Sequence, residues 1–104
     1  MKISEIQFDG RAQEYSREFN TVFVNFDRLV KSGEQTFIRV YYAGNPRVAI
    51  NPPWDGGFSW DKDANGNDWV GVSCQGLGAS SWWPNKDHQS DEPDSMLISC
   101  QVPA

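Results

Sequence analysis

The sequence is poor in the side chains that most often build catalytic and metal sites, with one histidine, His88, and two cysteines, Cys74 and Cys100. Two cysteines are too few for a disulfide scaffold. Both lie in apolar runs typical of strands, so we expect two buried free thiols. The sequence is also compatible with a disulfide between Cys74 and Cys100. The cysteine content does not indicate whether the compartment is reducing or oxidising.

Long apolar runs and basic clusters are also missing. No stretch approaches the roughly 20 apolar residues that span a bilayer, and no apolar targeting segment follows the N-terminus. The formal net charge is −5, and the nine Lys and Arg residues are scattered along the chain. An acidic chain without a basic stripe does not suit a phosphate backbone or an anionic lipid surface. We therefore exclude nucleic acid and membrane as partners.

Helical periodicity is almost absent, and short strand signals recur. A chain of 104 residues holds one domain at most. We expect loops at 27–35 and 44–57, an Asp9-Gly10 turn, and a long irregular stretch from Gly76 to Asp94. The strands are expected within 2–8, 12–18, 20–26, 36–44, the hairpin 58–75, and 95–103. The sequence thus predicts an all-β, mostly antiparallel fold of about seven short strands with one long loop.

Residues 61–68, "DKDANGND", imitate the start of a calcium-binding loop. The twelfth position of such a loop requires a bidentate Glu, but Val72 stands there. The flanking residues are strand-like, and Asn65-Gly66 is a preferred turn pair. We therefore expect a hairpin turn here, with a weak calcium site as the alternative.

His88 lies among Asp87, Asp91 and Glu92. Such a cluster suits either a metal site or a solvated acidic surface, and we favour the surface. Ser80 and Ser81 lack the G-x-S-x-G context of a nucleophile elbow, and no H-E-x-x-H pair occurs. We assign no catalytic residue and no metal ligand to this chain.

The segment 74–84, "CQGLGASSWWP", is the most informative. Gly76 and Gly78 allow a close backbone approach and positive φ angles. The Gln75 amide, at an expected strand end, offers two donors and an acceptor. These residues suit recognition of a polar ligand backbone, although a strand end facing water would have the same composition.

Together with the following Asp91-Glu92-Pro93, this segment resembles the N-terminal domain of the aminopeptidase N family of zinc peptidases (gluzincins). "PPWDGGF" at 52–58 and "CQGLGASSWWPNKDHQSDEPDSM" at 74–96 look like its bacterial, Bacteroidetes-type branch. Gln75 stands nine positions before Pro84, as in the family. Ser73 replaces a second Gln that many members carry, and "NKDHQS" adds residues before Asp91.

The resemblance implies a saddle-like or sandwich-like β domain that covers a thermolysin-like catalytic domain. Residues 1–104 would then be part of the N-terminal β domain of a larger metallopeptidase, beginning in mid-sheet, with the catalytic domain absent. Gln75 and Gly76 would contact the peptide substrate, and Gln75 would hold its N-terminal residue. Zinc, its ligands and the general base would belong to the catalytic domain, which is also the implied partner, so the fragment should be inactive.

Two other functions are compatible with the sequence. A free-standing β-sandwich module would bind carbohydrate through exposed Trp54, Trp82 and Trp83, because indole rings stack on sugar rings. A small hydrolase would use Asp and His side chains from residues 87–92. A downstream H-E-x-x-H in the same reading frame would favour the aminopeptidase over both.

Overall fold

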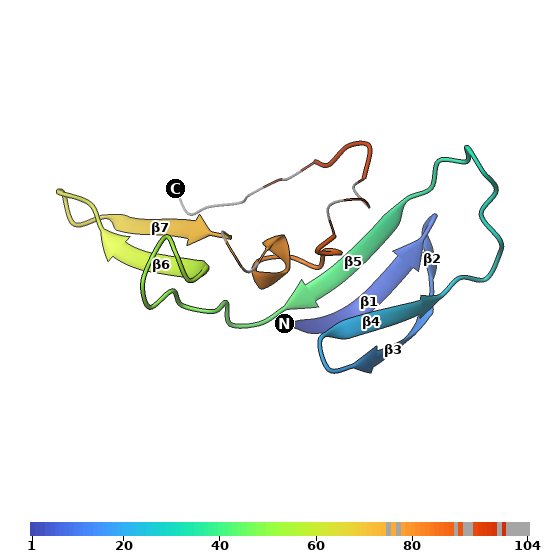
Figure 1. Ribbon diagram of the computed structural model, residues 1–104, viewed down its shortest axis with the longest axis horizontal. Helices are drawn as coiled ribbons and strands as arrows, with labels where there is room; N and C mark the ends of the chain where they lie inside the picture. The colour runs from blue at the N-terminus through green and yellow to red at the C-terminus, as the bar shows by residue number, and fades with distance from the viewer. Residues whose placement is uncertain (75, 77, 89, 91–92, 98, 100–104) are drawn as a thin grey trace. The chain divides into compact units, whose positions relative to one another are not determined.

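The computed structural model describes residues 1–74, 76, 78–88, 90, 93–97 and 99. Within these residues the fold is all-β, with seven strands in small antiparallel sheets and one short 3₁₀ helix (Figure 1). This confirms the fold class that the sequence predicts. The chain divides into two compact units, Met1–Pro46 and Arg47–Ala104. In the described part, no helix is long and apolar enough to cross a membrane.

The first unit is built around β1 (Lys2–Phe8), the central strand of a sheet with the order β2-β1-β5. Its neighbours are β2 (Arg11–Ala12) and β5 (Ile38–Ala43), both antiparallel to it. Asp9 and Gly10 form the two-residue turn between Phe8 and Arg11, with φ angles of 47° and 81°. Positive φ at both positions matches the right-handed twist of the strands, so the predicted turn is confirmed.

A second hairpin in this unit pairs β3 (Glu14–Glu18) with β4 (Thr21–Asn25). The sequence predicts one strand over 12–18, but the structure divides it at Gln13. The Gln13 amide donates to the Ile6 carbonyl at 2.8 Å. Two residues later, the Tyr15 hydroxyl donates to the Ile3 carbonyl at 2.9 Å. One backbone hydrogen bond and one side-chain hydrogen bond therefore hold this segment against β1.

Few apolar side chains are buried. Ile6 and Phe8, each 2% exposed, are the only fully buried hydrophobic residues in the described part. The Phe8 ring lies 4.5 Å from the Phe26 ring, and the Arg28 guanidinium lies 4.9 Å from the centre of the Phe8 ring. Both distances are favourable for ring and cation–π contacts. The core of this unit is thus one aromatic cluster beneath a cation.

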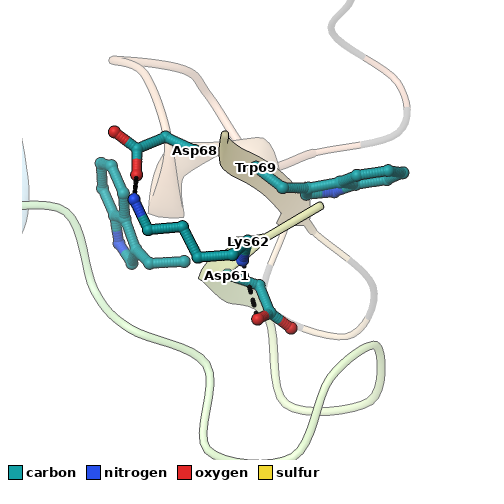
Figure 2. A pocket seen from close by; sticks show the side chains of 5 residues that line it. Asp61, Lys62, Asp68 and Trp69 are labelled. Carbon is teal, nitrogen blue, oxygen red and sulfur yellow. Dashed lines mark hydrogen bonds and ion pairs between the residues drawn. The ribbon is translucent and has the colours of Figure 1, made fainter. Parts of the chain in front are cut away.

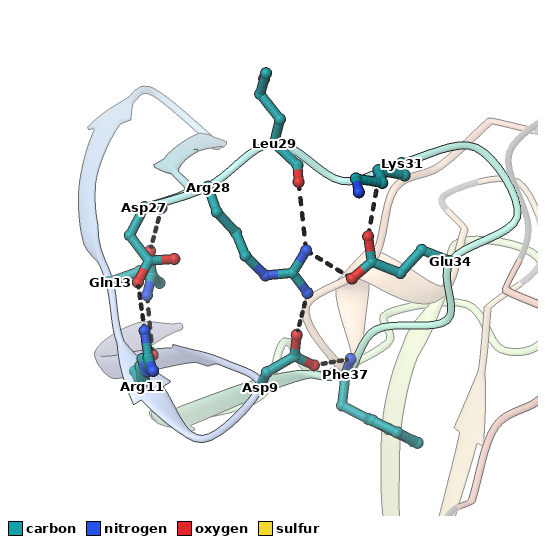
Figure 3. Close-up of polar contacts among 9 residues, drawn as sticks. All are labelled: Asp9, Arg11, Gln13, Asp27, Arg28, Leu29, Lys31, Glu34 and Phe37. Atoms are coloured by element: carbon teal, nitrogen blue, oxygen red, sulfur yellow. Dashed lines mark hydrogen bonds and ion pairs between the residues drawn. The ribbon is translucent and has the colours of Figure 1, made fainter.

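The same guanidinium fixes the long loop before β5 (Figure 3). Arg28 pairs with Asp9 at 2.7 Å and with Glu34 at 2.6 Å. The other Asp9 oxygen accepts the Phe37 amide at 2.9 Å. The Phe37 amide and the Arg28 side chain hold the pKa of Asp9 below its ordinary value. The loop that the sequence predicts is therefore held to the β1–β2 turn by one carboxylate and one guanidinium.

The second unit contains the antiparallel hairpin of β6 (Gly57–Lys62) and β7 (Asp68–Ser73). A single 3₁₀ turn, Ala79–Ser81, follows among the described residues. The strand predicted over 95–103 is not present at residues 95–97 and 99, and its remaining residues lie outside the described ones. An alternating apolar pattern forms a strand only where a neighbouring backbone completes the hydrogen-bond ladder.

We expect Phe8→Ala to destabilise the first unit by about 3–5 kcal/mol, the usual cost of emptying a buried aromatic site. Phe19→Ala is the matched control: Phe19 is 97% exposed, so its truncation should change stability by less than about 0.5 kcal/mol. All three tyrosines (Tyr15, Tyr41 and Tyr42) belong to this unit, so urea unfolding followed by tyrosine absorbance reports on it. Equal losses in the two variants would contradict this core assignment.

Candidate functional site

The two segments that carry the family resemblance meet in the second unit. The Ser73 hydroxyl, at the end of β7, donates to the Pro53 carbonyl at 2.6 Å. Gly76 follows at φ 81° and is exposed. A Cβ added there would lie 3.8 Å from the Trp54 carbonyl oxygen. Residues 20 positions apart in the sequence thus form one continuous surface.

The loop before β6 is organised by Asp55. One of its oxygens accepts the backbone amides of Ile50 at 2.6 Å and Asn51 at 3.0 Å. The Trp54 amide closes the turn onto the Asn51 carbonyl at 3.0 Å. Burial raises the pKa of Asp55, but the backbone amides of Ile50, Asn51 and Asp55, together with the Arg47 charge, outweigh burial, so the pKa is lowered overall. This carboxylate holds Trp54 at the surface, where it is 67% exposed.

Gly57 allows the same loop to run beside the start of β6. The Phe58 amide donates to the Arg47 carbonyl at 2.7 Å, and the Ala49 amide donates to the Phe58 carbonyl at 2.9 Å. Gly57 has φ 140°, and a Cβ there would lie 2.8 Å from the Ala49 nitrogen. Only glycine fits at that distance, so this residue is required by the close approach of two backbones.

After β7 the chain turns back through a second carboxylate contact. The Gly78 amide donates to the Cys74 carbonyl at 2.9 Å. Asp87 accepts the Ser80 hydroxyl in a short hydrogen bond and the Ser80 amide at 3.3 Å. A Cβ at Gly78, whose φ is 77°, would lie 2.7 Å from an Asp87 oxygen. Asp87 therefore holds the 78–81 turn. Its carboxylate occupies the space that a side chain at position 78 would need.

A row of aromatic rings joins this turn to the hairpin. Trp60 stacks on Phe58 with centroids 6.1 Å apart, and Trp82 meets the Phe58 ring edge-on at 6.2 Å. Trp83 extends the row, 4.6 Å from Trp82. Trp82 and Trp83 are half-buried, which corrects the expectation that they are exposed for sugar stacking. The reason is their packing in this row, which no local pattern in the sequence predicts.

The tip of the hairpin carries a shallow pocket of about 290 Å³ (Figure 2). Its lining side chains are two indoles and three charged groups: Trp60, Asp61, Lys62, Asp68 and Trp69. Lys62 pairs with Asp68, as the dashed line in Figure 2 shows. Register places Trp60 opposite Val70 and Asp61 opposite Trp69, so the two indoles lie on opposite faces of the hairpin. A flat ligand therefore has one exposed indole available on each face.

The sequence-predicted substrate residues are only partly visible. Gly76 lies on the surface described above, whereas Gln75 lies outside the described residues. The calcium-like segment forms the predicted hairpin turn, because Asp63 accepts the Asn65 and Asn67 amides, both at 2.8 Å. The Asn67 side chain and these backbone amides lower the pKa of Asp63.

The His88 ring contacts Ser90, whereas the Asp87 carboxylate contacts Ser80. The His88 Nδ1 lies 2.7 Å from the Ser90 hydroxyl, two residues away, and both residues are exposed. The Ser80 hydroxyl bonds to Asp87, so the described residues place no imidazole beside that serine. They also contain no group of three or more potential metal-ligating side chains. Asp91 and Glu92, which belong to the expected acidic cluster, lie outside the described residues.

Cys74 is a free, half-buried thiol that directly follows β7, rather than a fully buried strand residue. Its Sγ lies 3.9 Å from the Ser81 hydroxyl oxygen. The strand ends at Ser73, so Cys74 already belongs to the turn that Gly78 and Ser81 close. Cys100 lies outside the described residues.

Sequence reasoning missed the two aspartates that shape this surface, Asp55 and Asp87. Each accepts backbone amides in an irregular segment, a common role of aspartate in turns. The signal for Asp55 is its position in "PPWDGG", where a turn-forming acid follows two prolines. Asp87 has no comparable signal, because its partner lies seven residues earlier.

We expect Gly78→Ala to destabilise the second unit more than Gly66→Ala. Both positions have positive φ, so both variants incur the roughly 1–2 kcal/mol that an L side chain costs there. Only at Gly78 would the new methyl group also displace Asp87, since nothing lies within 4 Å of a Cβ at Gly66. All five tryptophans belong to this unit, so thermal unfolding followed by their fluorescence makes the comparison. Equal losses would show that the Asp87 contact contributes nothing.

The stability of the second unit should also fall at acid pH through Asp87. The Ser80 hydroxyl lowers the pKa of this carboxyl, and the Ser80 and Asn85 amides add to the effect. A lowered folded-state pKa stabilises the fold above the unfolded value, near 3.9, and this contribution is lost as pH falls through the folded value. We expect Asp87→Asn to reduce the melting temperature at neutral pH and to match the parent chain near about pH 2. A constant difference at both pH values would contradict this.

Comparisons with protein-family models, with curated proteins and with solved structures found no match to this chain. The family resemblance therefore rests on the residues of segments 52–58 and 74–96 and on their placement side by side.

Proposed function

We propose that residues 73–84 and the adjoining loop 50–57 form a non-catalytic wall of the peptide-binding cleft of a zinc aminopeptidase. The catalytic domain of that enzyme lies outside this chain. The observation that carries the proposal is the contact between the two resembling segments, where Gly76 approaches the Trp54 carbonyl. The hydrogen bond from the adjacent Ser73 to Pro53 holds the two segments together. Separate segments that form one surface are what a shared binding role requires.

The chemistry of this surface suits a peptide terminus. Gly76 is exposed and has no side chain, so a peptide backbone can approach its main chain closely. Trp54, whose carbonyl lies near Gly76, has an exposed side chain that can pack against an apolar group. In the proposal the Gln75 amide accepts a hydrogen bond from the substrate ammonium or bonds the first peptide unit. The wall supplies shape and polar contacts, and no covalent step.

Zinc belongs to the proposed enzyme and not to the described residues of this chain. They hold no group of three or more His, Cys, Asp or Glu side chains. In the proposal the zinc ligands belong to the catalytic domain. In the intact enzyme the metal would activate the water that hydrolyses the first peptide bond. The role that we propose for this chain is to position the substrate's N-terminal residue.

The exposed apolar surface of the hairpin supports a covering domain. Trp60 and Trp69 are 59% and 62% exposed, one on each face of β6–β7. A two-stranded hairpin is marginally stable in water without packing against further structure. A partner domain against either face would bury this area. The proposed partner is the enzyme's own catalytic domain.

A carbohydrate-binding module is the second candidate, and the hairpin pocket favours it. Trp60 provides an exposed indole next to the Lys62–Asp68 pair, and charged groups beside an aromatic face suit sugar hydroxyls. This version rests on Trp54, Trp60 and Trp69, because Trp82 and Trp83 are packed in the aromatic row. A binding module would act in the isolated chain, whereas a cleft wall requires the catalytic domain.

The decisive experiment uses the longest reading frame that contains this chain. We expect Gln75→Ala to lower kcat/KM for amino-acid anilides by roughly ten- to a hundred-fold, because a hydrogen bond to a charged group contributes about 1.5–3 kcal/mol. Gln75→Glu is the matched control: its carboxylate still accepts from the substrate ammonium, so it should keep more activity than the alanine variant. The 104-residue chain alone, with zinc added, should show no turnover.

Two outcomes would overturn the proposal. Unchanged kinetics in Gln75→Ala, with the longer protein active, would remove the substrate contact on which it rests. Turnover by the isolated chain that is lost in His88→Ala would favour the small hydrolase instead. Thermal unfolding of each variant separates a lost contact from a lost fold.

A further inference from the structure

The hairpin tip holds the only Asn-Gly pair in the sequence, Asn65-Gly66. The loop has three residues, because the Asp63 amide donates to the Asn67 carbonyl at 2.9 Å and the Gly66 amide donates to the Asp63 carbonyl at 3.0 Å. Gly66 takes the left-handed position at φ 85°, as expected when a type I turn leads into a glycine bulge. Asn65 and Gly66 are both exposed.

We propose that Asn65 is a site of spontaneous covalent modification, deamidation through a cyclic imide. The Gly66 nitrogen gives up its proton to base and attacks Cγ of Asn65. The new N–C bond forms, the side-chain nitrogen takes up a proton from the protonated base, the bond from Cγ to that nitrogen breaks, and ammonia leaves. Water then adds to either imide carbonyl. Opening at Cγ gives aspartate, and opening at the main-chain carbonyl gives isoaspartate, with one water consumed and no change of oxidation state.

The geometry leaves the attacking nitrogen accessible from the side-chain direction. Nothing lies within 4 Å of the position that a Cβ of Gly66 would occupy, so no side chain crowds the amide from that direction, although its N–H is bonded to the Asp63 carbonyl. The Asn65 side chain makes no hydrogen bond within the described residues, and only its backbone amide is held, by Asp63. The reaction requires the Gly66–Asp63 hydrogen bond to open, which an exposed turn allows more readily than a buried one.

Asn67 is an internal comparison two residues away. Its side-chain nitrogen donates to Asp63 at 2.9 Å, and its backbone amide is also held by Asp63. The following residue is Asp68, whose side chain shields its own nitrogen. Asn85 precedes Lys86 and donates to Asp87 at 3.2 Å. The fold thus restrains the side chains of these two asparagines and leaves that of Asn65 free to react.

The product changes the tip of the hairpin. Isoaspartate inserts a methylene into the main chain before Gly66, which lengthens a loop whose three-residue length sets the strand register. Both products add a negative charge beside Asp61, Asp63 and Asp68. The Lys62–Asp68 pair and the indoles of Trp60 and Trp69 lie on the strand residues that flank this tip. Modification should therefore alter the pocket that these residues line.

The test incubates the folded chain in mildly alkaline buffer and maps tryptic peptides by mass spectrometry. Cleavage after Lys62 and Lys86 places Asn65, Asn67 and Asn85 in one peptide, so the three are compared in a single spectrum. We expect conversion at Asn65 to be several-fold faster than at the other two. The Gly66→Ala variant, whose methyl group shields the attacking nitrogen, should reduce conversion at position 65 to their level.

The control separates folding from sequence. The same chain in concentrated urea should convert at Asn65, which verifies the chemistry. The proposal would be overturned if Asn65 converts in urea but stays intact in the folded chain. It would also be overturned if Asn65 in the folded chain converts no faster than Asn67 and Asn85. An Asn65→Asp variant, which carries the charge without the inserted methylene, distinguishes the two products by its tryptophan fluorescence. A change only after incubation identifies isoaspartate as the product that alters the pocket.

Discussion

Aspartate carboxylates that accept backbone amides hold the irregular parts of this protein in place. Asp9 accepts Phe37, Asp55 accepts two residues of the loop before β6, Asp63 closes the hairpin tip, and Asp87 holds the turn after β7. Each carboxyl has a lowered pKa, because each is hydrogen-bonded in its charged form. Charged acceptors form stronger hydrogen bonds than neutral ones, so four side chains can order long stretches without strands.

The need for such contacts follows from how little apolar surface is buried. Ile6 and Phe8 are the fully buried hydrophobic residues of the described part, whereas the hairpin indoles and several aliphatic side chains face outward. Small sheets that expose both faces gain little from the hydrophobic effect. Local polar contacts then determine where loops lie. The same exposed faces are the reason to place a second domain against this chain in the proposed enzyme.

The candidate wall shows how these contacts create a functional surface. Asp55 positions Trp54, Gly57 lets that loop approach β6, and the Ser73 hydroxyl joins the loop to the end of β7. Asp87 then folds the following turn against Gly78. The two segments on which the proposed function rests are thereby brought together. Their meeting supports the proposed role more than either segment alone.

The sequence by itself determined much of the local structure, although the strand expected over 95–103 is not present at residues 95–97 and 99. Alternating apolar residues marked the strands, Asp9-Gly10 and Asn65-Gly66 marked two turns, and the spacing of Phe58 and Trp60 placed both rings on one face. These features depend on neighbours one to four residues apart, where side-chain direction and backbone preference act directly.

Only the tertiary structure decided which segments meet. The break at Gln13, the packing of Trp82 against Phe58, and the hydrogen bonds of Asp87 have no counterpart in any local pattern. Each depends on a partner brought near by the path of the chain, as does Gly57, where an added Cβ would lie 2.8 Å from the Ala49 nitrogen. The type of a residue determines which hydrogen bonds its side chain can make, and the fold determines which partner lies near enough to make them.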